Sequence, residues 1–203
     1  MKNVCYTVIT NNYDTLKDPL VVSKDWRYVC FSDRGFKSKV WEVLPFNGNN
    51  REVKIKGHEY FKGLTLYVDA NFLIKKDLNT FIKDIPTDFS IAQHPQRSCI
   101  YQEAHRVVQK QIVNEKILLF QIERYRNEGF PADLGLGANG VLLRDFSKPI
   151  VRDICDLWWE EFQNGVPRDQ ISLSYCFWKL GVTPFYINVN SIRFYFKKRK
   201  HVR

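Results

Sequence analysis

Short apolar runs alternate along the chain with longer segments in which apolar residues recur every three or four positions. The short runs predict strands at residues 4–9, 27–31, 40–44, 64–68, 89–92 and 186–189, with a turn leading into a further strand at 137–144. The longer segments predict helices at 101–128, 150–163 and 169–180, and residues 50–62 fit a helix better than a strand. No linker or repeat interrupts this alternation, which indicates a single α/β domain.

Polar residues lie at or just beyond the ends of four predicted strands: Tyr6-Thr7, Ser32-Asp33, Asp69-Asn71 and Gln93-His94. In open α/β sheets the ligand crevice lies at the carboxyl ends of the strands. Because these polar groups would gather along one edge of the sheet, we expect a binding site there.

The charge balance indicates an anionic partner. The 203-residue chain carries 31 Lys and Arg against 22 Asp and Glu, a net charge of +9, and its 44% hydrophobic residues exclude a disordered protein. Five of the basic residues lie in 197–203, and without them the net charge is only +4. We therefore expect a folded domain at 1–196 and a basic tail at 197–203, or a connector to further domains. A nuclear localisation signal or nucleic-acid patch is the alternative for this tail.

An alternative function is that of a nucleic-acid-binding module, because the chain combines its net positive charge with fifteen Phe, ten Tyr and five Trp residues. The aromatic residues fall mostly at core-like positions, however, and no nucleic-acid motif is present. We therefore expect no nucleic-acid partner.

The five cysteines are odd in number, widely spaced and free of any CxxC pair, so neither a zinc cage nor a disulfide framework is predicted. Free thiols indicate a reducing compartment. The N-terminus lacks the apolar core of a signal peptide, and no apolar run is long enough to span a membrane. These features predict a cytoplasmic protein without a membrane span.

Asp69-Ala70-Asn71 places oxygen ligands at positions i and i+2, directly after an apolar strand. Mg²⁺ and Mn²⁺ prefer oxygen ligands and commonly use one or two carboxylates together with substrate phosphates. From the triplet alone, an Asx turn or a helix cap is the simpler interpretation.

Arg51 and Lys54 would share one helical face, at a spacing of three. Beside a metal-binding carboxylate such a face would cradle a pyrophosphate, since Arg binds it bidentately and Lys adds a point charge. An ordinary solvated basic face is the alternative.

Asp169 and Gln170 precede an aromatic-rich helix. Asp169 would cap this helix, where the helix dipole favours its negative charge. His94 and Arg97 follow the strand predicted at 89–92, where a lone His is more often structural. Asn139 lies in a glycine-spaced segment that lacks the context of a dinucleotide fingerprint, and this segment would form a plain tight connection or let a ligand approach the backbone.

Six segments follow, in order, the pattern of a glycosyltransferase family: YTVITNNYDTLKDP, YVCFSD, REVKIKGHEYF, LYVDAN, HPQRSCIYQEA and PRDQISLSY. Over residues 4–178 the chain resembles the small GT-A-type domains with which large algal viruses glycosylate their capsid proteins. It also resembles related plant and bacterial glycosyltransferase-like domains of formerly unknown function. The resemblance implies an α/β/α sandwich around a mixed, mostly parallel sheet.

The resemblance also implies a function and a role for each residue. The activity would be a metal-dependent transfer of a sugar from a nucleotide diphosphate sugar, with uridine as the base, to a glycan or glycoprotein acceptor. Tyr6, Thr7 and Tyr13 would line the nucleobase and ribose pocket, Asp33 would face the base, and Arg51 and Lys54 would approach the diphosphate. Asp169 would act at the reacting end of the sugar, as the general base of an inverting transfer or as an orienting carboxylate in a retaining one. The residues that would contact the donor sugar or the acceptor are His94, Arg97, Asn139 and Gln170.

The metal-binding DxD motif of the family would correspond to Asp69 and Asn71, holding Mn²⁺ or Mg²⁺. Asn71 replaces the second carboxylate of that motif and supplies only a neutral, weaker ligand. A non-catalytic nucleotide-sugar binder therefore remains a further alternative.

Overall fold

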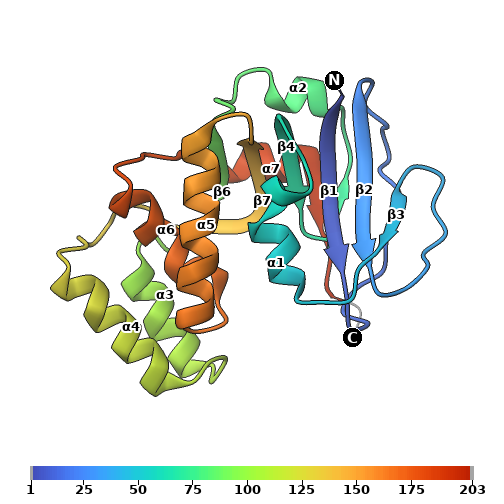
Figure 1. The fold of residues 1–203 in the computed structure, drawn as a ribbon. Coiled ribbons are helices and arrows are strands. Elements are labelled where there is room, and N and C mark those ends of the chain that lie inside the picture. Colours follow the sequence, from blue (N-terminus) through green and yellow to red (C-terminus); the bar gives the residue numbers. More distant parts are fainter. Residues whose placement is uncertain (1, 202–203) are drawn as a thin grey trace.

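In a computed structural model, which describes residues 2–201, a seven-stranded sheet has the order β3-β2-β1-β4-β7-β6-β8 (Figure 1). The strands are β1 (Asn3–Ile9), β2 (Trp26–Ser32), β3 (Glu42–Pro45), β4 (Leu64–Val68), β6 (Phe89–Gln93), β7 (Gly137–Asp145) and β8 (Phe185–Ile187). All neighbouring strands are parallel except at β7, which runs antiparallel to β4 and β6. The prediction of a mixed, mostly parallel sheet is confirmed.

Helices cover both faces of this sheet. They are α1 (Asn50–Ile55), α2 (Leu78–Ile82), α3 (Ile100–Gln109), α4 (Glu115–Asn127), α5 (Pro149–Asn164), α6 (Asp169–Lys179) and α7 (Val189–Tyr195), with a short 3₁₀ turn at Gly57–Glu59. Successive side chains of a strand point to opposite faces, so Tyr6 joins the core under α5 and α6, whereas Cys5 joins the core under α2 and α7. The result is an α/β/α sandwich.

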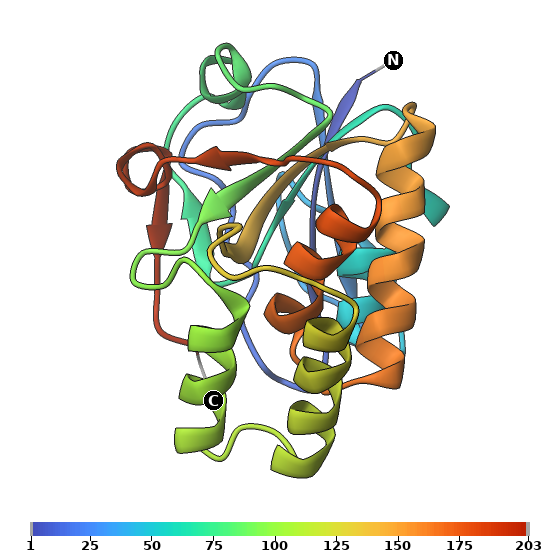
Figure 2. The same cartoon turned by 90° about the vertical axis from the view of Figure 1, so that its left-hand side faces the viewer.

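The helix predicted over 101–128 was wrong as one element, because the chain forms two helices there. Figure 2 shows α3 and α4 as an antiparallel hairpin. Gln111 lies in the left-handed region with φ 52°, and the Asn114 side chain caps α4 by accepting a hydrogen bond from the Ile117 amide at 3.2 Å. The apolar spacing continues across this break, and therefore periodicity alone did not reveal it.

The segment expected to be a basic tail begins as a strand. β9 (Phe196–Lys198) pairs antiparallel with β5 (Phe72–Ile74), and the Arg199 amide donates to the Asn71 carbonyl at 2.8 Å. The C-terminal segment thereby reaches the carboxyl end of β1 (Figure 1). Residues 202–203 of the predicted tail lie outside the described residues. Within 2–201, no helix combines the length and the apolarity needed to cross a membrane.

Candidate active site

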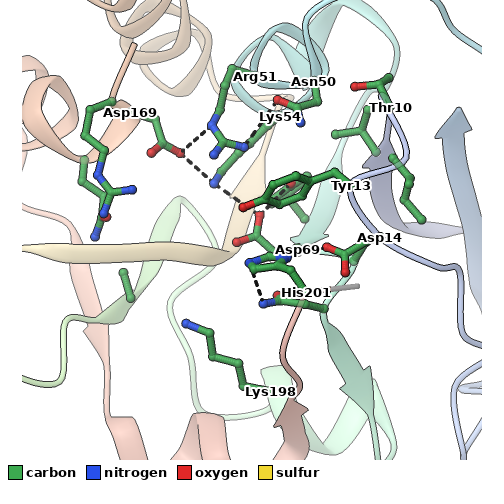
Figure 3. Close-up of a pocket in the computed structure, with 18 residues that line it drawn as sticks. Thr10, Tyr13, Asp14, Asn50, Arg51, Lys54, Asp69, Asp169, Lys198 and His201 are labelled. Carbon is green, nitrogen blue, oxygen red and sulfur yellow. Dashed lines mark hydrogen bonds and ion pairs between the residues drawn. The ribbon is translucent and has the colours of Figure 1, made fainter. Parts of the chain in front are cut away.

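A polar cavity of about 180 Å³ opens at the carboxyl ends of β1 and β4 and the first residues of α6 (Figure 3). Its lining includes the predicted site residues Tyr13, Arg51, Lys54, Asp69, Asn71, Asp169 and Gln170. The structure therefore brings together side chains that lie up to 157 positions apart in the sequence, Tyr13 and Gln170 being the extremes.

Lys54 lies between two carboxylates of the cavity. Its ammonium is 2.7 Å from Asp169 Oδ2 and 3.4 Å from Asp69 Oδ1, and the residue is only 2% exposed. The Arg51 Nε atom lies 3.7 Å from the same Asp169 oxygen. The short helix α1, capped by the Asn49 side chain, brings both basic residues to the cavity (Figure 3). Lys54 is therefore the cation that accompanies the partly exposed carboxylate at the end of β4.

Asp169 remains ionised in this environment. Burial acts to raise the pKa of its carboxyl group, but Lys54 and Arg51 outweigh burial and hold the pKa well below its usual range. A carboxylate with a lowered pKa is a weak proton acceptor. The predicted capping role was wrong, because Arg168 is the N-cap residue of α6 and makes no side-chain capping bond.

Asp69 and Asn71 do not form the Asx turn that the triplet alone favoured. The Asp69 carboxylate accepts a hydrogen bond from the Tyr67 hydroxyl at 2.8 Å, in addition to its contact with Lys54. Asn71 is 4% exposed, and its Nδ2 atom donates to the Arg199 carbonyl at 3.3 Å. Its Oδ1 atom is buried and has no hydrogen-bond partner within residues 2–201, so it is available to a ligand.

His201 also enters the cavity, a position that the sequence did not predict. Its Nδ1 atom lies 2.7 Å from Asp14 Oδ2, its Nε2 atom lies 3.1 Å from Asn71 Nδ2, and its ring is 4.5 Å from the Tyr13 ring. An ionised carboxylate only accepts and an amide nitrogen only donates. With hydrogen on Nδ1, the ring donates to Asp14 and its Nε2 electron pair accepts from the Asn71 amide, a bond that a metal on Nε2 would have to replace.

These groups fit a divalent cation in their chemistry. Asp69 supplies a carboxylate and Asn71 a buried oxygen without a partner within residues 2–201. His201 supplies an imidazole backed by Asp14, as in many metal sites, whose Nε2 atom would exchange its contact with the Asn71 amide for the metal. Within residues 2–201, no three His, Cys, Asp or Glu residues lie close enough together to hold a metal on their own. A cation here would therefore need the Asn71 amide oxygen and further oxygens from a bound substrate.

Two predicted nucleotide-site residues, Tyr6 and Thr7, do not line the cavity. Both are buried in β1, and the Tyr6 hydroxyl contacts the Lys54 carbonyl at 3.3 Å and accepts from Arg144. Asp33 lies outside the cavity as well, where it accepts a hydrogen bond from the Asn11 amide at 2.7 Å and borders a separate shallow hollow.

His94, Arg97 and Asn139, which were predicted to contact sugar or acceptor, also lie away from the cavity lining. The Nδ1 atom of His94 accepts from the Arg97 amide at 2.9 Å, and Arg97 pairs with the buried Glu103 at 2.6 Å. Asn139 is buried in β7 with φ 46°. Gln170, in contrast, lines the cavity and donates to the Gly137 carbonyl at 2.9 Å.

Sequence reasoning missed Asp14, Tyr67, Arg168, Lys198 and His201, all of which line the cavity. Asp14 and His201 are 187 positions apart, so no local motif connects them. Lys198 and His201 lie in a basic run that resembles a solvated tail, and only the pairing of β9 with β5 brings them to the site.

Solved structures share this fold at low sequence identity. The apo form of mouse xyloside xylosyltransferase 1 matches with a TM-score of 0.50 and 9% identity, over 92% of this chain and 85% of that chain. The apo WbbM bifunctional glycosyltransferase matches with a TM-score of 0.52 and 8% identity, over 92% of this chain and 38% of that chain. At these identities the likeness supports the GT-A fold alone.

Comparison with curated protein sequences gives no significant match. The family model described as TOD1/MUCI70, glycosyltransferase-like domain, matches residues 62–201, more than half of the chain. The matched region contains Asp69, Asn71, Asp169, Lys198 and His201, whereas α1 with Arg51 and Lys54 precedes it. On this match the chain belongs to the TOD1/MUCI70 glycosyltransferase-like domain family and is a glycosyltransferase.

Proposed function

We propose that this enzyme transfers a sugar from a nucleoside diphosphate sugar, with UDP as the nucleotide, to a glycan or a protein-linked glycan. The observation that carries the proposal is the convergence of Asp69, Asn71 and His201 next to a cluster of cations in one cavity. A diphosphate needs positive charge and a divalent cation needs oxygen and nitrogen ligands, and this cavity offers both.

Lys198 and Arg51 are the side chains that we assign to the diphosphate. Lys198 lines the cavity and makes no ion pair with a carboxylate of residues 2–201, and the Arg51 side chain is about a third exposed. Lys54, in contrast, is held by Asp69 and Asp169. Its role in the proposal is to keep these two carboxylates in place and to keep Asp169 ionised.

Asp69, Asn71 and His201 are the residues that would hold Mn²⁺ or Mg²⁺. A cation bound there would neutralise the negative charge that develops on the leaving nucleoside diphosphate. Tyr67 and Asp14 fix the Asp69 carboxylate and the His201 ring respectively, so the ligands are oriented before the substrate binds.

Asp169 has an orienting role in this proposal. Its lowered pKa makes it a weak general base, which favours the role of an orienting carboxylate in a retaining transfer over that of a general base in an inverting one. Its fixed negative charge, next to Gln170 at the start of α6, would orient the donor sugar and stabilise positive charge on the reacting carbon.

Thermal unfolding with a panel of nucleotides tests the proposal. UDP with Mn²⁺ should raise the melting temperature more than UDP or Mn²⁺ alone, because a ligand that binds only the folded state stabilises it. Uridine, which lacks phosphates, is the matched control and should give little shift. Release of UDP from a panel of UDP-sugars then identifies the donor. If no nucleoside diphosphate changes the melting temperature with either metal, the proposal is refuted.

A further inference from the structure

Three segments far apart in the sequence lie side by side around β5. They comprise residues 17–24, 75–76 and 193–200, and we call them together the basic–apolar surface. The Leu20 amide donates to the Ile74 carbonyl at 2.9 Å, the Lys75 amide to the Tyr195 carbonyl at 2.8 Å, and the Arg199 amide to the Asn71 carbonyl at 2.8 Å. These backbone bonds fix the three segments side by side.

Almost all the net charge of the protein lies on this surface. Its segments contain nine Lys and Arg and a single acidic residue, Asp18, which gives a net charge of +8 out of +9 for the whole chain. Asp18 is itself engaged, since its carboxylate accepts from the Ser38 hydroxyl and from the Lys39 amide. The rest of the molecule is therefore close to neutral, and the net excess of positive charge is concentrated in one region.

Exposed apolar side chains lie among these cations. Leu20 is 67% exposed, Val22 58% and Phe194 54%, and Val21 between the first two is exposed as well. The Lys76 ammonium lies 4.2 Å from the centre of the Phe194 ring. Apolar side chains that protrude from a lysine-rich surface are the pattern by which peripheral proteins enter the boundary between lipid headgroups and acyl chains.

We propose that the basic–apolar surface binds an anionic lipid bilayer, with Leu20, Val22 and Phe194 entering the interface. The lysines contact headgroup phosphates and carboxylates around them. Seven of the nine basic residues are Lys, a point charge suited to a diffuse anionic layer. A nucleic acid fits less well, because the aliphatic side chains Leu20 and Val22 offer no ring on which a base could stack.

This surface is continuous with the active-site cavity. Lys198 and His201, which line the cavity, belong to or directly follow the same C-terminal segment. A bilayer bound to the surface would therefore lie beside the opening of the site. The proposal goes beyond the proposed function and does not depend on it, since lipid binding is measured without a sugar donor.

Co-sedimentation with lipid vesicles tests the proposal. The wild-type protein should bind vesicles of phosphatidylserine and phosphatidylcholine, should fail to bind pure phosphatidylcholine, and should be released by added salt, which screens exposed charges. The double variant Leu20→Asp, Phe194→Asp and the double variant Lys75→Glu, Lys76→Glu should each lose about tenfold or more of the affinity. Their melting temperatures would establish that they fold.

Phe120→Asp is the matched control, because the Phe120 side chain on α4 is 72% exposed and lies outside the surface. It should bind vesicles as well as the wild type. Wild-type protein that ignores phosphatidylserine vesicles, or folded surface variants that bind them equally well, would overturn the proposal. Tight binding to a single-stranded oligonucleotide in place of vesicles would do the same.

Discussion

Replacement of His201 by Ala should weaken the binding of a divalent cation and, through it, of the donor diphosphate. The Nε2 atom of this side chain lies beside Asn71, and its ring is oriented by Asp14. Loss of a hydrogen-bond partner behind a metal ligand typically costs about 10- to 100-fold in affinity, or about 1.4–2.8 kcal/mol. We therefore expect a loss of this size for Asp14→Asn and at least as large a loss for His201→Ala.

Calorimetric titration of Mn²⁺ into each variant, with UDP present, measures this loss directly. Lys200→Ala is the matched control, because it changes an exposed residue of the same segment and should leave Mn²⁺ affinity unchanged. The His201 side chain is about a third exposed, so its removal should alter the free energy of unfolding little in the absence of metal. Unchanged Mn²⁺ affinity in a folded His201→Ala protein would refute the assignment of His201 as a metal ligand.

Three further substitutions test the rest of the site. Lys54→Met should destabilise the protein by about 3–5 kcal/mol, because it leaves the buried Asp169 carboxylate without its closest cation. The folded-state pKa of Asp169 lies below its unfolded value in the wild type, so its stabilising contribution is present above the unfolded pKa and is lost as the pH falls. In Lys54→Met the loss of the Lys54 charge raises the folded-state pKa of Asp169 relative to the wild type. The deficit in the free energy of unfolding, measured with urea, should therefore shrink on acidification. An unchanged deficit at acidic pH would contradict this. Asn71→Asp should strengthen Mn²⁺ binding because it adds a carboxylate. It should also lower the melting temperature of the metal-free protein, because the hydrogen bond donated to the Arg199 carbonyl is lost. A variant in which both the Mn²⁺ affinity and the melting temperature are unchanged would argue against the site. Gly140→Ala should weaken Mn²⁺ binding, because the added Cβ atom would lie 3.1 Å from Asp69 Oδ2 and 2.9 Å from the Phe72 ring and would displace the carboxylate. If this variant bound Mn²⁺ as tightly as the wild type, the position of Asp69 would not be critical for metal binding.

Local patterns predicted the parts of the molecule whose structure is determined locally. The apolar runs at β1, β2 and β4 were recognisable because buried strands need such side chains, and Asp69 was recognisable because a carboxylate at the end of such a run requires a partner. The identity of that partner, Lys54, followed only from the position of α1 in the fold. The break between α3 and α4 was missed because Asn114 acts as a cap within a continuous apolar spacing.

The residues that come from the C-terminal segment could not be predicted in the same way. The resemblance to known glycosyltransferases ended near residue 178, and the charge of residues 197–203 favoured a solvated tail. His201 gains its significance from Asp14 and Asn71, which are contributed by the ends of β1 and β4. Such long-range pairs depend on the strand order, which periodicity and composition do not determine.

The pairing of β5 with β9 has a consequence for how the activity can be lost. All strands of the seven-stranded sheet precede residue 188, so that sheet forms without the help of residues 196–201. If β9 detached from β5, the cavity would lack Lys198 and His201 and would open on one side. Cleavage of the chain just before β9 would therefore abolish donor binding while the large sheet remained folded.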